Sequence, residues 1–97
     1  MVSTSYIIGI AKIVDEPKFE ILDNNTYFTT CKAELEQSKN ISLNFWGNLA
    51  HDIIEDCQID DYILVEGHIS LQENEIPIDS ILSKKVILTV LKVHLIY

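Results

Sequence analysis

Positive charge is scarce in this sequence of 97 residues. It contains no arginine, and its seven lysines are outnumbered by fifteen acidic residues, so the formal net charge is −8. Nine of the carboxylates fall between His51 and Ser83, a stretch without a lysine. A nucleic-acid-binding domain usually carries a basic stripe and a high isoelectric point. The composition therefore argues against a binding surface that depends on positive charge alone.

Glycine, proline and cysteine are also rare, with three, two and two copies. No GxxxxGK[ST], GxGxxG, HExxH or GxSxG motif occurs, and three glycines are too few for a phosphate-binding loop, which argues against an enzyme. Cys31 and Cys57 form no CxxC pair, so we expect two reduced, buried thiols. His51, His68 and His94 have no second ligand at metal spacing, so we expect no metal site and no cofactor.

Long apolar runs and low-complexity segments are absent as well. No run reaches the roughly 20 residues that span a bilayer, and residues 1–6 lack the features of a signal peptide. Hydrophobic residues make up 47% of the chain and are spread along it. We therefore expect one folded, intracellular domain over residues 1–97, without membrane insertion.

Alternation of apolar and polar residues predicts strands at 6–14, 27–35, 41–46, 62–71 and 86–97. Residues 19–22 continue in extended form before a hairpin turn at 23–26, "DNNT". After Trp46 the period becomes helical, with Asn48 as a candidate cap. For the acidic residues 72–83 we expect a long loop or a short hairpin. Three strands, a short helix and two more strands indicate an all-β, five-stranded OB-fold barrel with the helix between strands three and four.

Side-chain parity predicts which residues enter the core. In the second strand the core face has every other residue from Tyr27 to Leu35, and in the third strand it has Ile41, Leu43 and Phe45. Trp46, the only tryptophan, falls on the opposite, polar face.

Two segments carry a resemblance to a known family. "LNFWGNLAHDIIEDCQIDDYILVEGHISL" at 43–71 resembles the most recognisable part of the bacterial single-stranded-DNA-binding proteins, and "GIAKIVDEPKF" at 9–19 resembles their opening strand. The "FWGNLA" run and the short length are similar to the short members encoded in algal plastid genomes. The resemblance implies an OB fold that binds single-stranded DNA or RNA as a homo-oligomer in the plastid stroma. Without it, the expected location is the cytoplasm.

The resemblance also implies which residues bind. In the family, bases stack on aromatic side chains of the barrel, and Trp46 occupies the position of one of them, so Trp46 is the candidate stacking residue. The alternative is a tryptophan packed beneath a loop or a partner. Further candidates are Phe28 for stacking, Lys12, Lys32, Lys84 and Lys85 for phosphate contacts and, more weakly, Tyr62 and His68.

The chain departs from the family at several positions. Asn40 and Asn74 stand where aromatic residues are expected, and Glu73, Glu75 and Asp79 make a normally basic loop acidic. No acidic tail follows Tyr97, so we expect no recruitment of partners by a tail. These departures leave a second hypothesis open. The chain would then be an acidic OB-fold subunit of a larger, possibly plastid, assembly that has lost nucleic-acid binding and contacts a protein partner through its acidic 51–79 surface or an edge strand.

Overall fold

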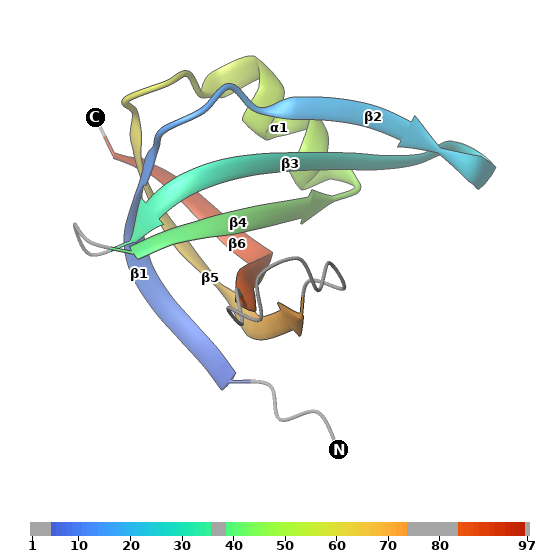
Figure 1. The fold of residues 1–97 in the computed structure, drawn as a ribbon. Helices are drawn as coiled ribbons and strands as arrows, with labels where there is room; N and C mark the ends of the chain where they lie inside the picture. The colour runs from blue at the N-terminus through green and yellow to red at the C-terminus, as the bar shows by residue number, and fades with distance from the viewer. Residues whose placement is uncertain (1–4, 36–38, 74–83, 97) are drawn as a thin grey trace.

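The computed structural model describes residues 5–35, 39–73 and 84–96 (Figure 1). The elements in chain order are β1 (Ser5–Ile13), β2 (Lys18–Leu22), a 3₁₀ turn η1 (Asp23–Asn25), β3 (Thr26–Leu35), β4 (Lys39–Trp46), α1 (Asn48–Asp56), β5 (Tyr62–Glu73) and β6 (Lys84–Ile96). The predicted all-β architecture with one short helix is confirmed. Of the predicted acidic loop, residues 74–83, with Asn74, Glu75 and Asp79, lie outside the described residues.

The six strands form one sheet that closes on itself. Their order is β1-β5-β6-β4-β3-β2, and an additional pairing joins β1 to β3. Among the strands that the structure describes, only β4 and β6 pair in parallel. The pairing of Ala11–Ile13 with Ala33–Leu35 completes the barrel, and β2 stays outside it in a hairpin that projects to one side (Figure 1).

The extension predicted at 19–22 is a strand of its own, β2, so the helix follows the fourth strand along the chain. β2 pairs with β3 from Lys18 opposite Thr30 to Leu22 opposite Thr26. It is separate from β1 because Pro17, which has no backbone N–H, interrupts the ladder. In the turn, Asn24 and Asn25 have φ of 68° and 59°, the left-handed conformation expected of the "DNNT" segment.

The core contains the alternate strand residues that the sequence predicted to point inward, with one exception. Its largest fully buried side chains include Phe45 and Leu43 of β4, and Cys31 and Ala33 of β3 are buried beside them. Tyr27, which the same pattern assigned to the core, is instead 38% exposed. The reason is its place in the part of β3 that pairs with β2, beyond the closed barrel.

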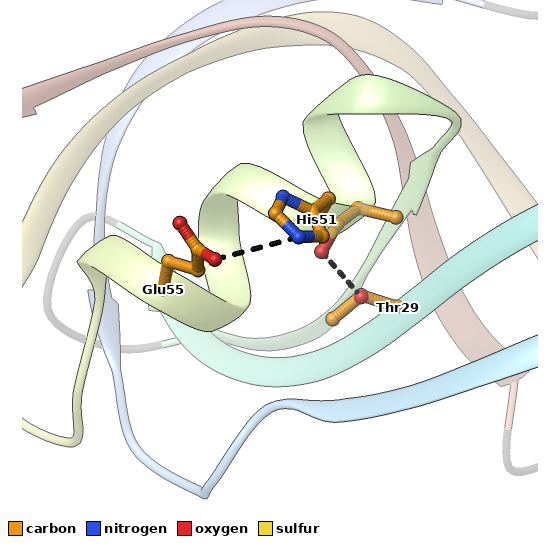
Figure 2. Close-up of polar contacts among 4 residues, drawn as sticks. Thr29, His51 and Glu55 are labelled. Atoms are coloured by element: carbon orange, nitrogen blue, oxygen red, sulfur yellow. Dashed lines mark hydrogen bonds and ion pairs between the residues drawn. The ribbon is translucent and has the colours of Figure 1, made fainter.

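Helix α1 packs against β2, β3 and β4 and buries Ala50 and Ile53. It begins after Gly47, whose φ of 67° and ψ of −133° turn the chain out of β4. The prediction that Asn48 caps the helix is wrong, because Asn48 is already helical and no side chain caps the N-terminus. On β3 the buried hydroxyl of Thr29 donates a hydrogen bond of 2.7 Å to the carbonyl oxygen of Ala50 (Figure 2). This bond ties the helix to the hairpin.

A bulge bends the β5–β6 ladder. The register changes from Glu66 opposite Lys92 to Gly67 opposite Val90, which leaves Leu91 as the extra residue. Leu91 is 48% exposed, whereas Val90 is buried. A bulge increases the local twist and so helps a short sheet to close.

Candidate nucleic-acid interface

Trp46 and Phe28 form an aromatic pair on the outer surface of the barrel. They lie opposite each other on β4 and β3. Their ring centroids are 4.5 Å apart, and the ring planes make an angle of 47°. Alternation along β4 buries Phe45 and turns Trp46 outward, where it is 45% exposed. Within the part of the chain that the structure describes, Trp46 is therefore not covered by a loop.

The next pair of residues on the same face of these two strands is polar. Thr30 lies opposite Asn44, and its hydroxyl donates a hydrogen bond of 3.2 Å to Asn44 Oδ1. The following pair is Lys32 opposite Ser42. Because residues two apart on a strand share a face, the rings and Lys32 lie on the same side of the β3–β4 ladder.

Lys32 and Lys85 meet at a groove of about 490 Å³ on this surface. They reach it from β3 and β6, the two strands that flank β4. None of the described residues that line the groove carries a negative charge. Two ammonium groups on one groove attract an anion such as a backbone phosphate. The lining residues are Val14, Lys32, Asn40, Ile41, Ser42, Lys85 and Val86.

The other two candidate lysines are placed differently. Lys12 on β1 has its Nζ 3.7 Å from a carboxylate oxygen of Asp60 and 6.0 Å from the centroid of the Tyr62 ring. Lys84 begins β6, opposite Glu73 of β5. The structure thus brings Trp46 and Phe28 onto one surface with Lys32 and Lys85, and it places Lys12 beside a carboxylate.

The weaker candidates Tyr62 and His68 lie on β5. Tyr62 is half exposed and pairs with Lys12 across the β1–β5 ladder. The His68 ring packs edge-on against Tyr6 at 5.4 Å. The Tyr6 hydroxyl donates a hydrogen bond to Glu66, which raises the pKa of Tyr6. These rings belong to the β1–β5 side of the barrel rather than to the β3–β4 surface.

Three exposed carboxylates lie on the helix side of the hairpin. Asp52, Glu55 and Asp56 are exposed on α1. Glu55 lies 3.4 Å from His51 Nε2 (Figure 2). Since Thr29 contacts α1 and Phe28 is its neighbour on β3, the aromatic pair and the acidic helix lie on opposite sides of the strand.

Sequence reasoning missed a second aromatic cluster on the helix side of the hairpin. Phe19 and Tyr27 have centroids 5.6 Å apart, and Tyr27 lies 6.4 Å from the His51 ring. A signal for this cluster is present in the sequence. Phe19 and Tyr27 lie an even number of residues apart on the two sides of the "DNNT" turn, so in a hairpin their side chains can point to the same face. Asn40 was noted only as a lost aromatic residue, whereas in the structure it lines the groove.

Cys31 and Cys57 are both buried and free, as the sequence predicted. Burial raises the pKa of the Cys31 thiol to about 12, with contributions from Cys57 and Asp15. Burial also raises the pKa of the Cys57 thiol to about 11, with contributions from Asp61 and Asp56. Both thiols stay protonated near neutral pH, so neither is a nucleophile there.

In residues 5–35, 39–73 and 84–96, no three or more His, Cys, Asp or Glu side chains gather as a metal site. Over the same ranges, no helix combines the length and the apolar character that a membrane span requires.

No family model matches the chain. The sequence is 33% identical over 87 residues to "Putative single-stranded DNA-binding protein ycf41" of Trieres chinensis, with 77% of each chain covered. Among solved structures, the second single-stranded DNA-binding protein of Mycobacterium smegmatis superposes with a TM-score of 0.78 at 18% identity, covering 95% of this chain and 86% of the other. The SSB domain of a Synechococcus sp. protein superposes with a TM-score of 0.72 at 23% identity, covering 92% of both chains.

The two structural likenesses establish the fold, and the identity and coverage of the Trieres chinensis protein establish the relationship. The chain therefore belongs to the OB-fold family of single-stranded-DNA-binding proteins that includes this ycf41 protein.

Proposed function

We propose that this protein binds single-stranded DNA without catalysis, stacking bases on Trp46 and Phe28. The observation that carries the proposal is the exposed ring pair on a surface that also holds Lys32 and Lys85. Stacking on aromatic rings contributes about 1 to 3 kcal/mol per base and tolerates any sequence. The name of the Trieres chinensis relative describes the same kind of ligand.

The proposed path runs along β4 from Trp46 to Asn40. At roughly 3.4 Å per residue, this distance is about 20 Å. It passes the hydrogen-bonded pair of Thr30 and Asn44 and ends at the groove of Lys32 and Lys85. A path of this length holds a few nucleotides, at the low end of the roughly 4 to 16 that one OB fold occupies.

Fluorescence of the single tryptophan tests the proposal directly. We expect titration with poly(dT) to quench Trp46 emission, and the affinity to be higher at roughly 20 mM than at roughly 200 mM salt. Trp46→Ala, followed by the anisotropy of a labelled oligonucleotide, should bind about tenfold to a hundredfold more weakly. Unchanged emission at low salt would contradict the proposal. A matching titration with poly(rU) tells whether RNA is also a ligand.

Homo-oligomer formation is part of the proposal. Its support is a set of exposed apolar side chains on the outer face of β1, β5 and β6, where Ile8 is 62% and Ile10 51% exposed and Tyr62 lies opposite Ile96. Glu66 and Lys92, opposite each other on the same face, add charged groups to it. Sedimentation of the wild-type chain should show an oligomer, and Ile10→Lys should shift it toward the monomer. A wild-type monomer at every concentration would refute this part.

The second candidate function is an acidic subunit of a larger assembly, in the plastid or elsewhere, that has lost DNA binding. The net charge of −8 and the exposed carboxylates of α1 favour it. It predicts no quenching in the titration above, so one experiment separates the two functions. The plastid stroma remains the proposed location on the resemblance to the plastid-encoded members, and fractionation of the source cells would test it.

A further inference from the structure

A second groove, of about 560 Å³, lies between the β1–β2 connection and the C-terminal end of α1. At its base Cys57 is only 4% exposed. Ile54 and Ile59 remain 37% and 47% exposed at its walls. Covering such side chains with an apolar group is favourable, at about 25 cal/mol per Å² of apolar surface. The lining residues are Glu16, Pro17, Lys18, Ile54, Cys57, Gln58 and Ile59.

The surroundings of this groove carry net negative charge. Its lining holds Glu16 and Lys18, and Asp56 and Asp61 flank the lining segment 57–59 with two further carboxylates. The helix also directs its C-terminus, the negative end of its dipole, toward the groove, and its last turn has no basic residue. The charges of Asp61 and Asp56 add to burial in raising the pKa of Cys57. An occupant that carries positive charge is therefore attracted, and nucleic acid is repelled.

We propose that this groove binds a basic peptide segment of a partner protein, with one apolar side chain seated between Ile54 and Ile59 and flanking lysines or arginines beside the carboxylates. A second copy of this chain fits less well, because it offers only seven lysines against fifteen acidic residues to pair with these carboxylates. The basic segment at Lys84–Val86 would also have to leave the lysine groove that Lys85 lines.

The peptide groove and the aromatic pair belong to different sides of the molecule. Ile54 lies on α1, which packs on the Thr29 side of β3, whereas Phe28 points to the other side. DNA and the partner peptide can therefore be bound at the same time. The inference goes beyond DNA binding and does not depend on it.

Amide shift mapping with defined peptides tests the proposal on the full isotope-labelled chain. The probes are capped peptides Gly-Lys-Lys-Xaa-Lys-Lys-Gly with Leu, Ile, Phe or Trp at Xaa. We expect the amides of 16, 18 and 54–59 to shift with at least one of them. The peptide with Ser at Xaa and the one with Glu in place of every Lys should bind at least about tenfold more weakly.

Matched variants locate the site. Ile59→Ser and Ile54→Ser should each lower the affinity for the tightest-binding peptide by about tenfold. Ile21→Ser removes an isoleucine that is 58% exposed on β2 and should leave the peptide affinity unchanged. The amide spectrum of each free variant verifies its fold, and all three should bind poly(dT) like the wild type. The proposal is overturned if no apolar probe shifts these amides at millimolar concentration, if the Ser peptide binds equally well, or if Ile21→Ser weakens binding as much as Ile59→Ser.

Discussion

Trp46 stands directly opposite Phe28 across the β3–β4 ladder, with 4.5 Å between the ring centroids. Strand register, rather than a loop, holds the two rings together, so both are in place before any ligand arrives. Such preorganisation lowers the conformational entropy that binding costs. Phe28 is half-buried and Trp46 more exposed, so Phe28 supports the indole while Trp46 offers the larger surface to a base.

This support predicts that the two rings act as one unit. Phe28→Ala should weaken DNA binding because it frees the indole of Trp46 to adopt other rotamers. The losses from Phe28→Ala and Trp46→Ala should then sum to more than the loss in the double variant, by about 0.5 kcal/mol or more. Anisotropy titrations of the four proteins with labelled oligo(dT) measure this coupling. Phe19→Ala, which removes a ring on the helix side of the hairpin, is the control and should change affinity little. Strictly additive losses would contradict the coupled pair.

The lysine groove predicts a particular salt dependence. Lys32→Gln and Lys85→Gln should each flatten the slope of log affinity against log salt by about 0.7, the value for one phosphate contact on a single strand. Lys12→Gln should change the slope less, because Lys12 already lies 3.7 Å from Asp60. Titrations at several salt concentrations give the slopes. An equal effect from Lys12→Gln would show that the phosphate path runs along β1 instead.

Local patterns were sufficient to predict most of the barrel. Alternation in 41–46 placed Phe45 inside and Trp46 outside, and the structure confirms both. The same rule failed at Tyr27, because parity tells which side of a strand a residue lies on but not whether another element covers that side. Burial of Tyr27 depends on where the hairpin leaves the barrel, which is a property of the closed sheet.

The sequence could not predict that Lys32 and Lys85 line the same groove. It results from the parallel pairing of β4 with β6, which joins Ser42 to Ile87 across a separation that no local pattern encodes. The contact of Lys12 with Asp60 depends on a turn in which Asp60 adopts φ of 77°. The sequence predicted an acidic turn here, but it could not predict the direction in which the carboxylates of the turn point.

The β5–β6 bulge predicts that Gly67 cannot be replaced. A Cβ at this position would overlap the carbonyl oxygen of Thr89 and lie 2.9 Å from its carbonyl carbon, and backbone atoms of a paired strand have little room to move. Gly67→Ala should lower the free energy of unfolding by about 3 kcal/mol or more. Gly9→Ala is the matched control, since its Cβ meets only the end of the flexible Leu35 side chain, at 3.1 Å. Urea unfolding of both variants measures the difference, and equal stabilities would mean that β6 shifts to make room.

The buried thiols predict a loss of stability in alkali. Cys31 and Cys57 have pKa values raised to about 12 and about 11, whereas in the unfolded chain both titrate near the ordinary value of 9.0. Below pH 9 the thiols are protonated in both states. Above it the unfolded chain releases its thiol protons first, so the free energy of unfolding falls as pH rises toward the folded pKa values. The limiting slope is about 1.4 kcal/mol per pH unit for each thiol.

Urea unfolding from about pH 7 to about pH 11 should therefore show a steeper decline in the free energy of unfolding for the wild type than for the double variant Cys31→Ala, Cys57→Ala. The double variant shares the remaining titrating groups, so it isolates the effect of the thiols. Parallel curves would show that the folded protein releases these protons as readily as the unfolded chain, and that water reaches the sulfur atoms.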